Sequence, residues 1–225
     1  MALAMMAILV VALVATVLYI VAMGIRQRRQ ARTLARLTAE LSLRFSRDDP
    51  LELPEALSEF SLVAGGHSAR ASHVAYGRLD EMDVAAFNFR YEVGHGTRRL
   101  TRHYSMFLAR VGHDLPPVVM WNTRDPDVTP VDMHRVDQHV AGWACTGSRI
   151  LADIVKDTAG ELAGKGLSVE VRHRQMLLAL PGRQSAWWNY TTWLQPAREV
   201  VGSLATGDEL AGPPALSDGY DPVAG

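Results

Sequence analysis

The chain has 225 residues, a formal net charge of −1 from 23 basic and 24 acidic residues, and one cysteine. A lone cysteine excludes an internal disulfide framework and a zinc site built from clustered cysteines, and it is typical of a reducing compartment. The charge is close to balanced, and the globular part is mildly acidic without the arginines near the N-terminus. We therefore expect no nucleic-acid partner, because such a partner requires a basic face.

The first 25 residues contain no charged side chain, and their polar or turn-prone interruptions are Thr16, Tyr19 and Gly24. A hydrocarbon core of about 30 Å needs about 20 apolar residues in a helix. The run therefore predicts a transmembrane helix over residues 1–25. A signal peptide fits less well, because no basic residue precedes this long run. A buried core helix is also less suitable, because such a helix is rarely apolar on every face.

Five arginines follow the run before the first acidic residue: Arg26, Arg28, Arg29, Arg32 and Arg36. By the positive-inside rule, they place the N-terminus outside and the following domain in the cytoplasm, at the inner membrane of a bacterial cell. They are also candidate ligands for lipid headgroups, although setting the topology is the simpler interpretation. Residues 26–42 are predicted to continue the helix as a basic, amphipathic juxtamembrane segment. Its Leu34, Leu37 and Leu41 share the face that packs on the domain.

Residues 43–205 are predicted to form the cytoplasmic domain. A short strand at 43–45 and a helical turn within 51–60 come first. The apolar period then changes to two, which predicts four strands joined by tight turns into an antiparallel meander. These strands are expected at residues 71–79, 84–93, 100–111 and 117–121. A fifth strand is expected within 134–143.

An amphipathic helix is predicted at 148–162, because apolar residues recur there at helical spacing and glycines follow. Residues 167–171 and 175–180 are predicted to form a hairpin. A last helix is expected at 190–204, and its Pro196 should break or restart it. The small, polar tail at 206–225 is predicted to be disordered.

The fold class predicted from these elements is α+β. It combines an N-terminal transmembrane helix with a cytoplasmic domain of antiparallel strands, a meander plus a hairpin, and two or three packing helices. The cytoplasmic domain is expected to follow the juxtamembrane segment as a single unit, since its length suits one domain of ordinary size.

No metal or cofactor site is predicted. Of the eight histidines, His134 and His139 are five residues apart, which puts them on opposite faces of a strand and about 140° apart on a helix. Neither geometry chelates a metal. The glycines and arginines of residues 94–99 could form an anion-binding nest, but a hairpin tip is the simpler interpretation because the lysine and helix of a phosphate loop are missing.

Cys145 is a candidate nucleophile, with His139 and Ser148 nearby in sequence. Such a role needs a base within hydrogen-bonding reach and an electropositive setting, so a structural thiol is the simpler interpretation. An aromatic cluster could line a ligand groove, lie at a membrane surface or help to bury the last helix. Its members are Trp187, Trp188, Tyr190 and Trp193.

Three segments carry a resemblance to known proteins: residues 41–45, residues 87–91 before a glycine-containing turn, and residues 167–171 followed by Pro181 and Gly182. With these segments, the chain resembles a family of uncharacterised bacterial single-pass membrane proteins with a C-terminal domain of unknown function. The likeness covers most of residues 34–205. It implies architecture and location, and no known activity or catalytic residues.

The sequence therefore predicts a membrane-anchored protein whose domain binds a partner protein or acts as a scaffold, with membrane lipids around the helix and no assigned catalytic residue. One alternative is a membrane-tethered hydrolase-like enzyme using Cys145 or a histidine. Another is a sensor for a small ligand or lipid headgroup. A cleft with convergent polar groups would favour an enzyme or ligand site, whereas an exposed apolar patch would favour a partner surface.

Overall fold

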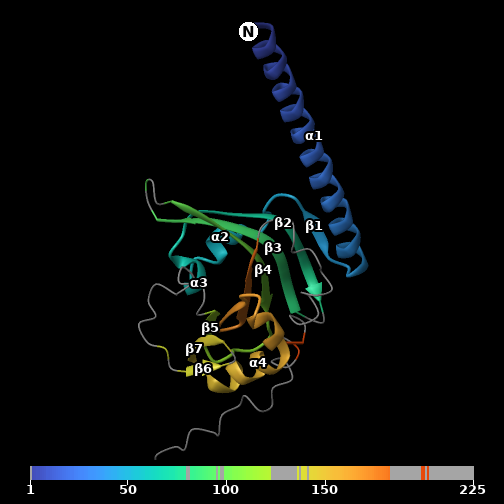
Figure 1. The fold of residues 1–225 in the computed structure, drawn as a ribbon. Helices are drawn as coiled ribbons and strands as arrows, with labels where there is room; N and C mark the ends of the chain where they lie inside the picture. Colours follow the sequence, from blue (N-terminus) through green and yellow to red (C-terminus); the bar gives the residue numbers. More distant parts are fainter. Residues whose placement is uncertain are drawn as a thin grey trace, which may run out of the picture.

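The computed structural model describes residues 2–79, 82–94, 96, 99–122, 136, 138–140, 142–182, 199–200 and 202. Within these residues, one nine-stranded antiparallel sheet runs in the order β1-β2-β3-β4-β9-β8-β5-β7-β6 (Figure 1). The strands are β1 (Arg44–Ser46), β2 (His67–Leu79), β3 (Met82–Val93), β4 (Leu100–Arg110), β5 (Val118–Asn122), β6 (Gln138–Val140), β7 (Trp143–Gly147), β8 (Ser168–Arg172) and β9 (Gln175–Pro181). The helices are α1 (Ala2–Glu40), α2 (Leu53–Ala56), α3 (Ser61–Ala64) and α4 (Arg149–Ala163).

Helix α1 projects away from the sheet, and its C-terminal end lies beside β1 (Figure 1). The helix ends in a Schellman motif, in which Ser42 adopts a φ of 58°. The Ser42 N–H donates to the Ala39 carbonyl at 3.1 Å, and the Leu43 N–H donates to the Thr38 carbonyl at 2.8 Å. Leu43 and Thr38 are buried, and Leu41 packs against the same core. These contacts hold the helix end on the sheet and confirm a helix continuing past residue 26.

The predicted meander is confirmed for its first three strands, since β2 pairs with β3 and β3 pairs with β4. The prediction is wrong for the fourth strand. The hairpin of β8 and β9, itself confirmed, lies between β4 and β5, with β9 paired to β4 and β8 paired to β5. Local alternation specifies the face that a strand buries and not its neighbour in the sheet, so the sequence pattern could not place β5.

The remaining local predictions meet different outcomes. The strand expected within 134–143 is divided: β6 and β7 pair as a hairpin around Gly142, whose φ of 93° suits a residue without a Cβ. The helix expected at 190–204 and the tail at 206–225 lie almost entirely outside the described residues.

The sheet buries a core on each face. Alternating residues of β3 divide between the two, with Val84 and Ala86 in one core and Phe87 and Phe89 in the other. The first core lies under α4, and we call this side of the sheet the α4 face. The second core lies under α2 and α3, and we call this side the α2–α3 face.

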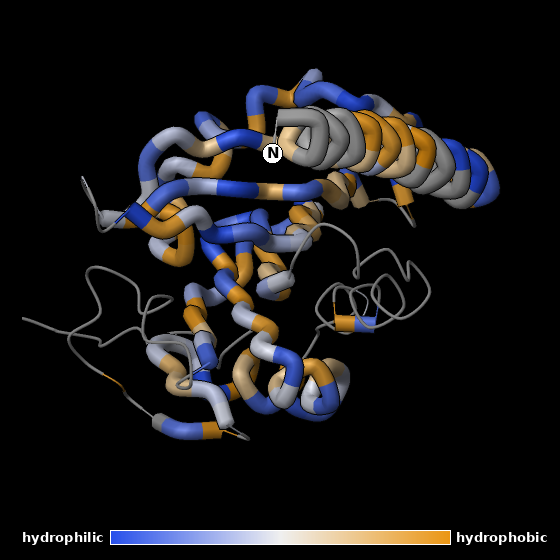
Figure 2. The backbone as a smooth tube through the Cα atoms, turned by 45° about the horizontal axis from the view of Figure 1, so that its top comes forward, coloured by the Kyte–Doolittle hydropathy of each residue, from blue (hydrophilic) through white to orange (hydrophobic). Residues whose placement is uncertain are grey.

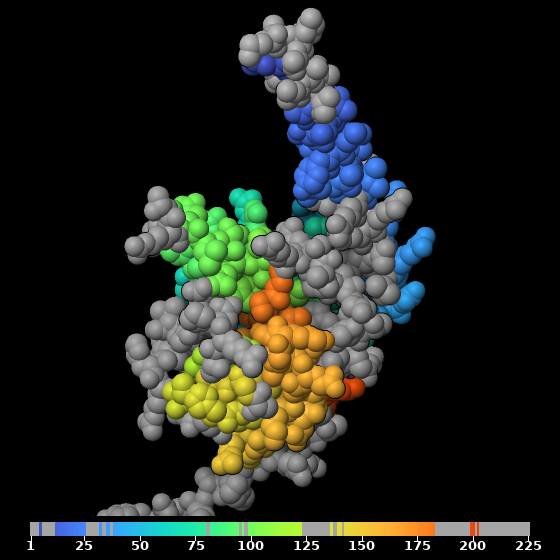
Figure 3. Space-filling model, viewed as in Figure 1, coloured from blue at the N-terminus to red at the C-terminus, as the bar shows by residue number. Residues whose placement is uncertain are grey.

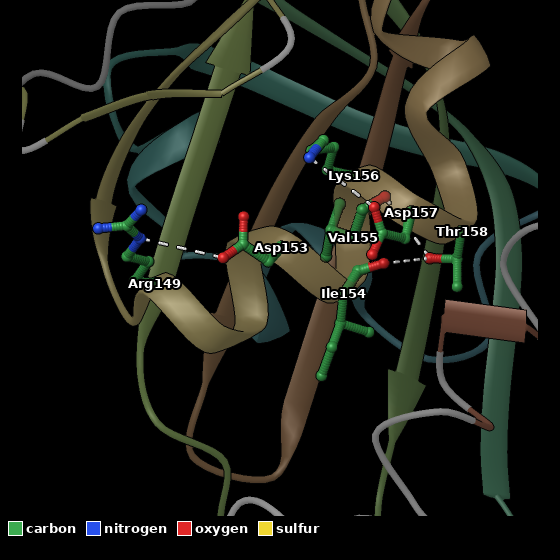
Figure 4. Close-up of polar contacts among 7 residues, drawn as sticks. All are labelled: Arg149, Asp153, Ile154, Val155, Lys156, Asp157 and Thr158. Atoms are coloured by element: carbon green, nitrogen blue, oxygen red, sulfur yellow. Dashed lines mark hydrogen bonds and ion pairs between the residues drawn. The ribbon is translucent and has the colours of Figure 1, made fainter.

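Helix α4 begins where the Ser148 hydroxyl accepts a hydrogen bond from the Leu151 N–H at 3.4 Å. Its inner side places Leu151 and Val155 in the core. Its outer side is charged, and Figure 4 shows Arg149 directed toward Asp153, with 4.0 Å between Nε and Oδ2. The amphipathic helix predicted from the sequence is therefore confirmed.

The predicted fold class, α+β with a transmembrane helix, is wrong. The described chain is dominated by a single antiparallel sheet, α2 and α3 are single turns, and α4 is the longer helix that packs on the sheet. The physical reason is that the meander and the hairpin share backbone hydrogen bonds through β4 and β9, so the strands form one continuous sheet that dominates the described chain.

The predicted membrane span is also wrong. Among the described residues, no helix combines the length and apolar character needed to cross a membrane. The apolar side chains that the structure describes in continuous sequence occupy residues 12–25 of α1 and are exposed. The inner-membrane location and the outside-to-cytoplasm topology depended on that span, and they are corrected with it.

Candidate functional site

Two rows of polar side chains lie on the α4 face of β2, β3 and β4, beyond the apolar core. The first row consists of Arg70, Arg90 and His103, which occupy directly opposite positions on the three strands. The second row consists of Ser72, Asn88 and Ser105, which are paired in the same way. Directly opposite residues have Cβ atoms about 4.5–5.5 Å apart, so each row is a contiguous polar strip. We call these six residues the polar rows.

A bulge in β2 aligns these rows. Ser72 pairs with Asn88 and Ala75 with Ala86, so β2 contains one residue more than β3 between the two pairs. His73 lies in this interval with a φ of 54°. The extra residue lets Ser72 stay on the same face as the buried Ala75, although the two are three positions apart. The polar rows therefore continue directly from the core.

The polar rows border a cleft of about 310 Å³. Arg70, Arg90 and His103 line it, and Asp48 is its one acidic residue among those the structure describes. Gly182, just after β9, closes one edge, because its N–H donates to the His103 carbonyl at 3.1 Å. The cleft is thus a polar hollow with more basic than acidic groups.

The floor of the cleft is formed by Ser72 and Asn88, and Asn88 is only 9% exposed. Ser105 lies opposite Asn88 but outside the lining of the cleft; it is 1% exposed, and its Oγ has no hydrogen-bond partner in the described part of the protein. The Nδ1 atom of His73 lies 3.4 Å from both Ser72 Oγ and Asn88 Nδ2. Burial, and then the positive charge of Arg47, lower the pKa of His73 from its usual value, while Asp48 acts in the opposite direction. His73 is therefore a neutral hydrogen-bonding group at pH 7.

The first polar row concentrates positive charge. Like charges directly opposite each other on adjacent strands destabilise a sheet, and Arg70 and Arg90 are such a pair. Glu92 follows Arg90 on the same face of β3, but its carboxylate lies 3.2 Å from Arg99 and 3.7 Å from His67. Across the described ranges, no ion pair involves Arg70 or Arg90.

A second candidate surface is the stretch 12–25 of α1, which we call the apolar segment. Leu13, Leu18 and Ile20 are 66%, 63% and 63% exposed. Figure 2 shows an orange band along the helix and blue at its C-terminal end, and Figure 3 shows the same helix extending beyond the body of the molecule. Monomeric soluble proteins rarely expose large contiguous apolar patches, so this segment indicates an interaction surface.

The basic residues after the apolar segment are partly described. Arg32 and Arg36 are exposed on α1, whereas the side chains of Arg26, Arg28 and Arg29 lie outside the described residues, as do those of Leu34 and Leu37.

The polar rows were not among the sequence-based site predictions. The alternation in β3 puts Asn88 and Arg90 on one face, but their neighbours on β2 and β4 follow from the register and the bulge.

Cys145 lies in the core of the α4 face and is 0% exposed. Its Sγ is 4.0 Å from the Trp143 carbonyl oxygen. Burial raises the pKa of this thiol to about 11, and a nearby backbone hydrogen bond opposes the shift. A nucleophilic cysteine requires an accessible thiolate, so the described surroundings are those of a structural thiol.

We expect native Cys145 to resist thiol reagents. With a pKa of about 11, about one thiol in a thousand is ionised at pH 8, and burial blocks access as well. The reaction with Ellman's reagent should be slow in buffer and fast in concentrated urea, where the thiol regains its ordinary pKa. A short cysteine peptide provides the reference rate. Equal rates for native and unfolded protein would contradict the buried position.

The other sequence-based candidates do not converge. Within the described ranges, no group of three or more His, Cys, Asp or Glu residues is placed to hold a metal ion. Much of residues 94–99, together with His134 and the aromatic cluster of Trp187, Trp188, Tyr190 and Trp193, lies outside the described residues. A further cavity of about 380 Å³ beside β5, β7 and β8 has mainly apolar walls, including Val118 and Val171.

Comparison with known proteins yields little. No family model matches the chain, and no curated protein matches it. The resemblance to an uncharacterised bacterial family therefore stays a prediction. Among solved structures, the chain is similar to the mycobacterial trehalose monomycolate transport factor A, TtfA, with a TM-score of 0.47 and 11% sequence identity. The aligned region covers 76% of this chain and 90% of that chain.

Proposed function

We propose that this protein is a protein-binding scaffold domain, and that the apolar segment of α1 docks into an apolar groove of a different protein. The observation that carries the proposal is the exposure of the segment, in which Leu13, Leu18 and Ile20 each keep more than 60% of their surface in solvent. At about 25 cal/mol per Å² of apolar surface removed from water, covering such side chains strongly favours association.

The attachment of the helix supports this role. The Schellman motif and the burial of Thr38 and Leu43 hold the base of α1 on the sheet. A helix held at one end presents its free end with little additional conformational entropy to lose on binding, which favours affinity. The sheet then serves as the body that holds the docking helix.

The composition of α1 describes the expected partner. The apolar segment carries no charged residue, so the matching groove should be apolar along its length. Arg32 and Arg36 are exposed beyond its C-terminal end, so acidic side chains are expected at the corresponding rim. Rim charges of this kind increase the association rate and fix the orientation more than they add affinity.

Photo-crosslinking in cells tests the proposal. A benzophenone amino acid at Leu18 of the full chain should yield one discrete adduct with another protein. Val14 and Val21 lie at helical spacing on the same face as Leu18. Adding Val21→Glu should therefore reduce the adduct by about tenfold or more, because the partner groove would bury an unpaired charge.

Ile150 is the matched control position, because it is exposed on α4, away from α1. The probe at Ile150 should not yield the same adduct, and Ile150→Glu should leave the Leu18 adduct unchanged. Adducts of equal yield from both positions, or an adduct that survives Val21→Glu, would contradict the proposed docking. A Leu18 adduct that contains a second copy of this chain would indicate that the apolar segment mediates self-association and does not dock into a different protein.

A further inference from the structure

We propose that the cleft beside the polar rows binds a phosphoryl group, carried by a small phosphate monoester or by a phospholipid headgroup. This site is independent of the apolar segment, because it is built from β2, β3 and β4 on the α4 face. Three observations support it: the paired arginines, the hydrogen-bonding floor and the size of the cleft.

The paired arginines supply the charge. Arg70 and Arg90 face each other across β2 and β3, and His103 continues the row on β4. A phosphoryl group between the two guanidinium groups would replace their mutual repulsion by attraction. Each guanidinium is a planar fork that can donate two parallel hydrogen bonds to phosphate oxygens, and two forks suit an anion with three terminal oxygens better than a carboxylate with two.

The floor supplies uncharged hydrogen-bonding groups. Ser72 and Asn88 line the cleft beside Arg70 and Arg90, so a hydroxyl and an amide lie next to the two guanidinium groups. His73, which contacts both Ser72 and Asn88, holds this floor in place from the bulge.

The cleft also limits the rest of the ligand. Its volume of about 310 Å³ is at the small end for ligand sites. Asp48 on its border is an acceptor that repels additional negative charge and favours a hydroxyl group. The expected ligand therefore has one phosphoryl group on a compact, hydroxyl-bearing body, as in a sugar phosphate or a glycerol phosphate headgroup.

Isothermal titration calorimetry of the full chain at low ionic strength tests the site. Inorganic phosphate and glucose 6-phosphate should both bind, and glucose should not. Arg90→Gln should weaken phosphate binding by about tenfold or more, because it removes a charge-assisted hydrogen-bonding partner. Arg149→Gln is the matched control, since it removes the same charge from an 82% exposed side chain on α4. The Arg149→Gln variant should bind phosphate with the same affinity as the wild type.

A vesicle arm distinguishes the two sources of the phosphoryl group. A lipid headgroup would be supported if the protein floats with phosphatidic acid vesicles but not with phosphatidylcholine vesicles, and if Arg90→Gln abolishes this flotation. Binding of the soluble phosphates without flotation would support a free ligand. Equal loss of binding in Arg90→Gln and Arg149→Gln would overturn the site, since it would reveal a general charge effect. Absence of binding in both arms would also overturn it. Arg90 and Arg149 are both exposed, so neither substitution should disturb the fold. Matching melting curves of the two variants and the wild type would exclude misfolding.

Discussion

Replacing Glu170 with alanine is expected to destabilise the protein by about 2–6 kcal/mol, because two buried backbone amides would lose their acceptor and each unsatisfied donor costs about 1–3 kcal/mol. Glu170 lies on β8 and is 0% exposed. Its Oε1 accepts hydrogen bonds from the Ser61 N–H at 2.9 Å and from Arg172 Nε at 2.7 Å, and its Oε2 accepts one from the Leu62 N–H at 2.9 Å. Alanine would leave two buried amides and one guanidinium without this acceptor.

The two amides explain why an acid occupies this position. Ser61 and Leu62 are the first residues of α3, where backbone N–H groups have no partner within the helix. Glu170 satisfies both from the sheet and thereby attaches the α2–α3 layer to β8. Glu170→Gln keeps the shape and one acceptor oxygen, so we expect a smaller loss of about 1–3 kcal/mol.

Urea denaturation followed by circular dichroism measures both changes, with the midpoint falling at constant m value if the unfolded state is unaffected. Glu161→Ala is the control, because Glu161 is exposed on α4, and it should change stability by about 0.5 kcal/mol or less. If Glu170→Ala lay within about 1 kcal/mol of the wild type, the desolvation of the carboxylate would cancel its hydrogen bonds. The layer would then depend on the apolar core alone.

Replacing Trp143 with alanine is expected to destabilise the protein by about 4–5 kcal/mol, from the cavity and the lost hydrogen bond together. Trp143 lies on β7, is 0% exposed and belongs to the core of the α4 face. Its Nε1–H donates to the Leu167 carbonyl at 2.5 Å, which connects β7 to the segment just before β8. The side chain therefore packs the core and also satisfies a buried backbone acceptor.

Trp143→Phe separates these two contributions. Phenylalanine retains most of the aromatic packing but cannot donate a hydrogen bond. We therefore expect Trp143→Phe to lower the free energy of unfolding by about 2 kcal/mol, which is less than the loss expected for Trp143→Ala. Circular dichroism is again the readout, because removal of one of five tryptophans would change the fluorescence baseline. Ile150→Ala, at an exposed position of α4, is the control. Equal losses for Trp143→Phe and Trp143→Ala would assign the whole effect to the hydrogen bond.

The fold was predictable where its signal is local. Apolar alternation placed the faces of β3 and β4, and helical spacing placed α4. The N-terminal helix was likewise confirmed as a helix to Glu40, but its environment was predicted wrongly. Hydropathy alone reports that side chains avoid water and does not report what covers them. The same local signal therefore led to a membrane span that the described residues do not form.

The candidate site was less predictable, because each of its residues is ordinary within its own segment. Arg90 occupies a polar position of an alternating strand, and Arg70 lies before a bulge that periodicity does not reveal. Glu170 also appears as the polar position of a strand and would be expected in solvent, yet α3 covers it. These roles arise from contacts between residues far apart in the chain.

The separate elements follow from local sequence patterns: the long helix, the meander of β2, β3 and β4, the amphipathic α4 and the β8–β9 hairpin. Each follows from the spacing of apolar residues and turn residues within about 10–15 positions. The tertiary structure alone decided that the hairpin enters the sheet between β4 and β5, that Arg70, Arg90 and His103 meet in one row, and that Glu170 is buried. Strand neighbours are selected by packing and backbone pairing over the whole chain, which no local period encodes.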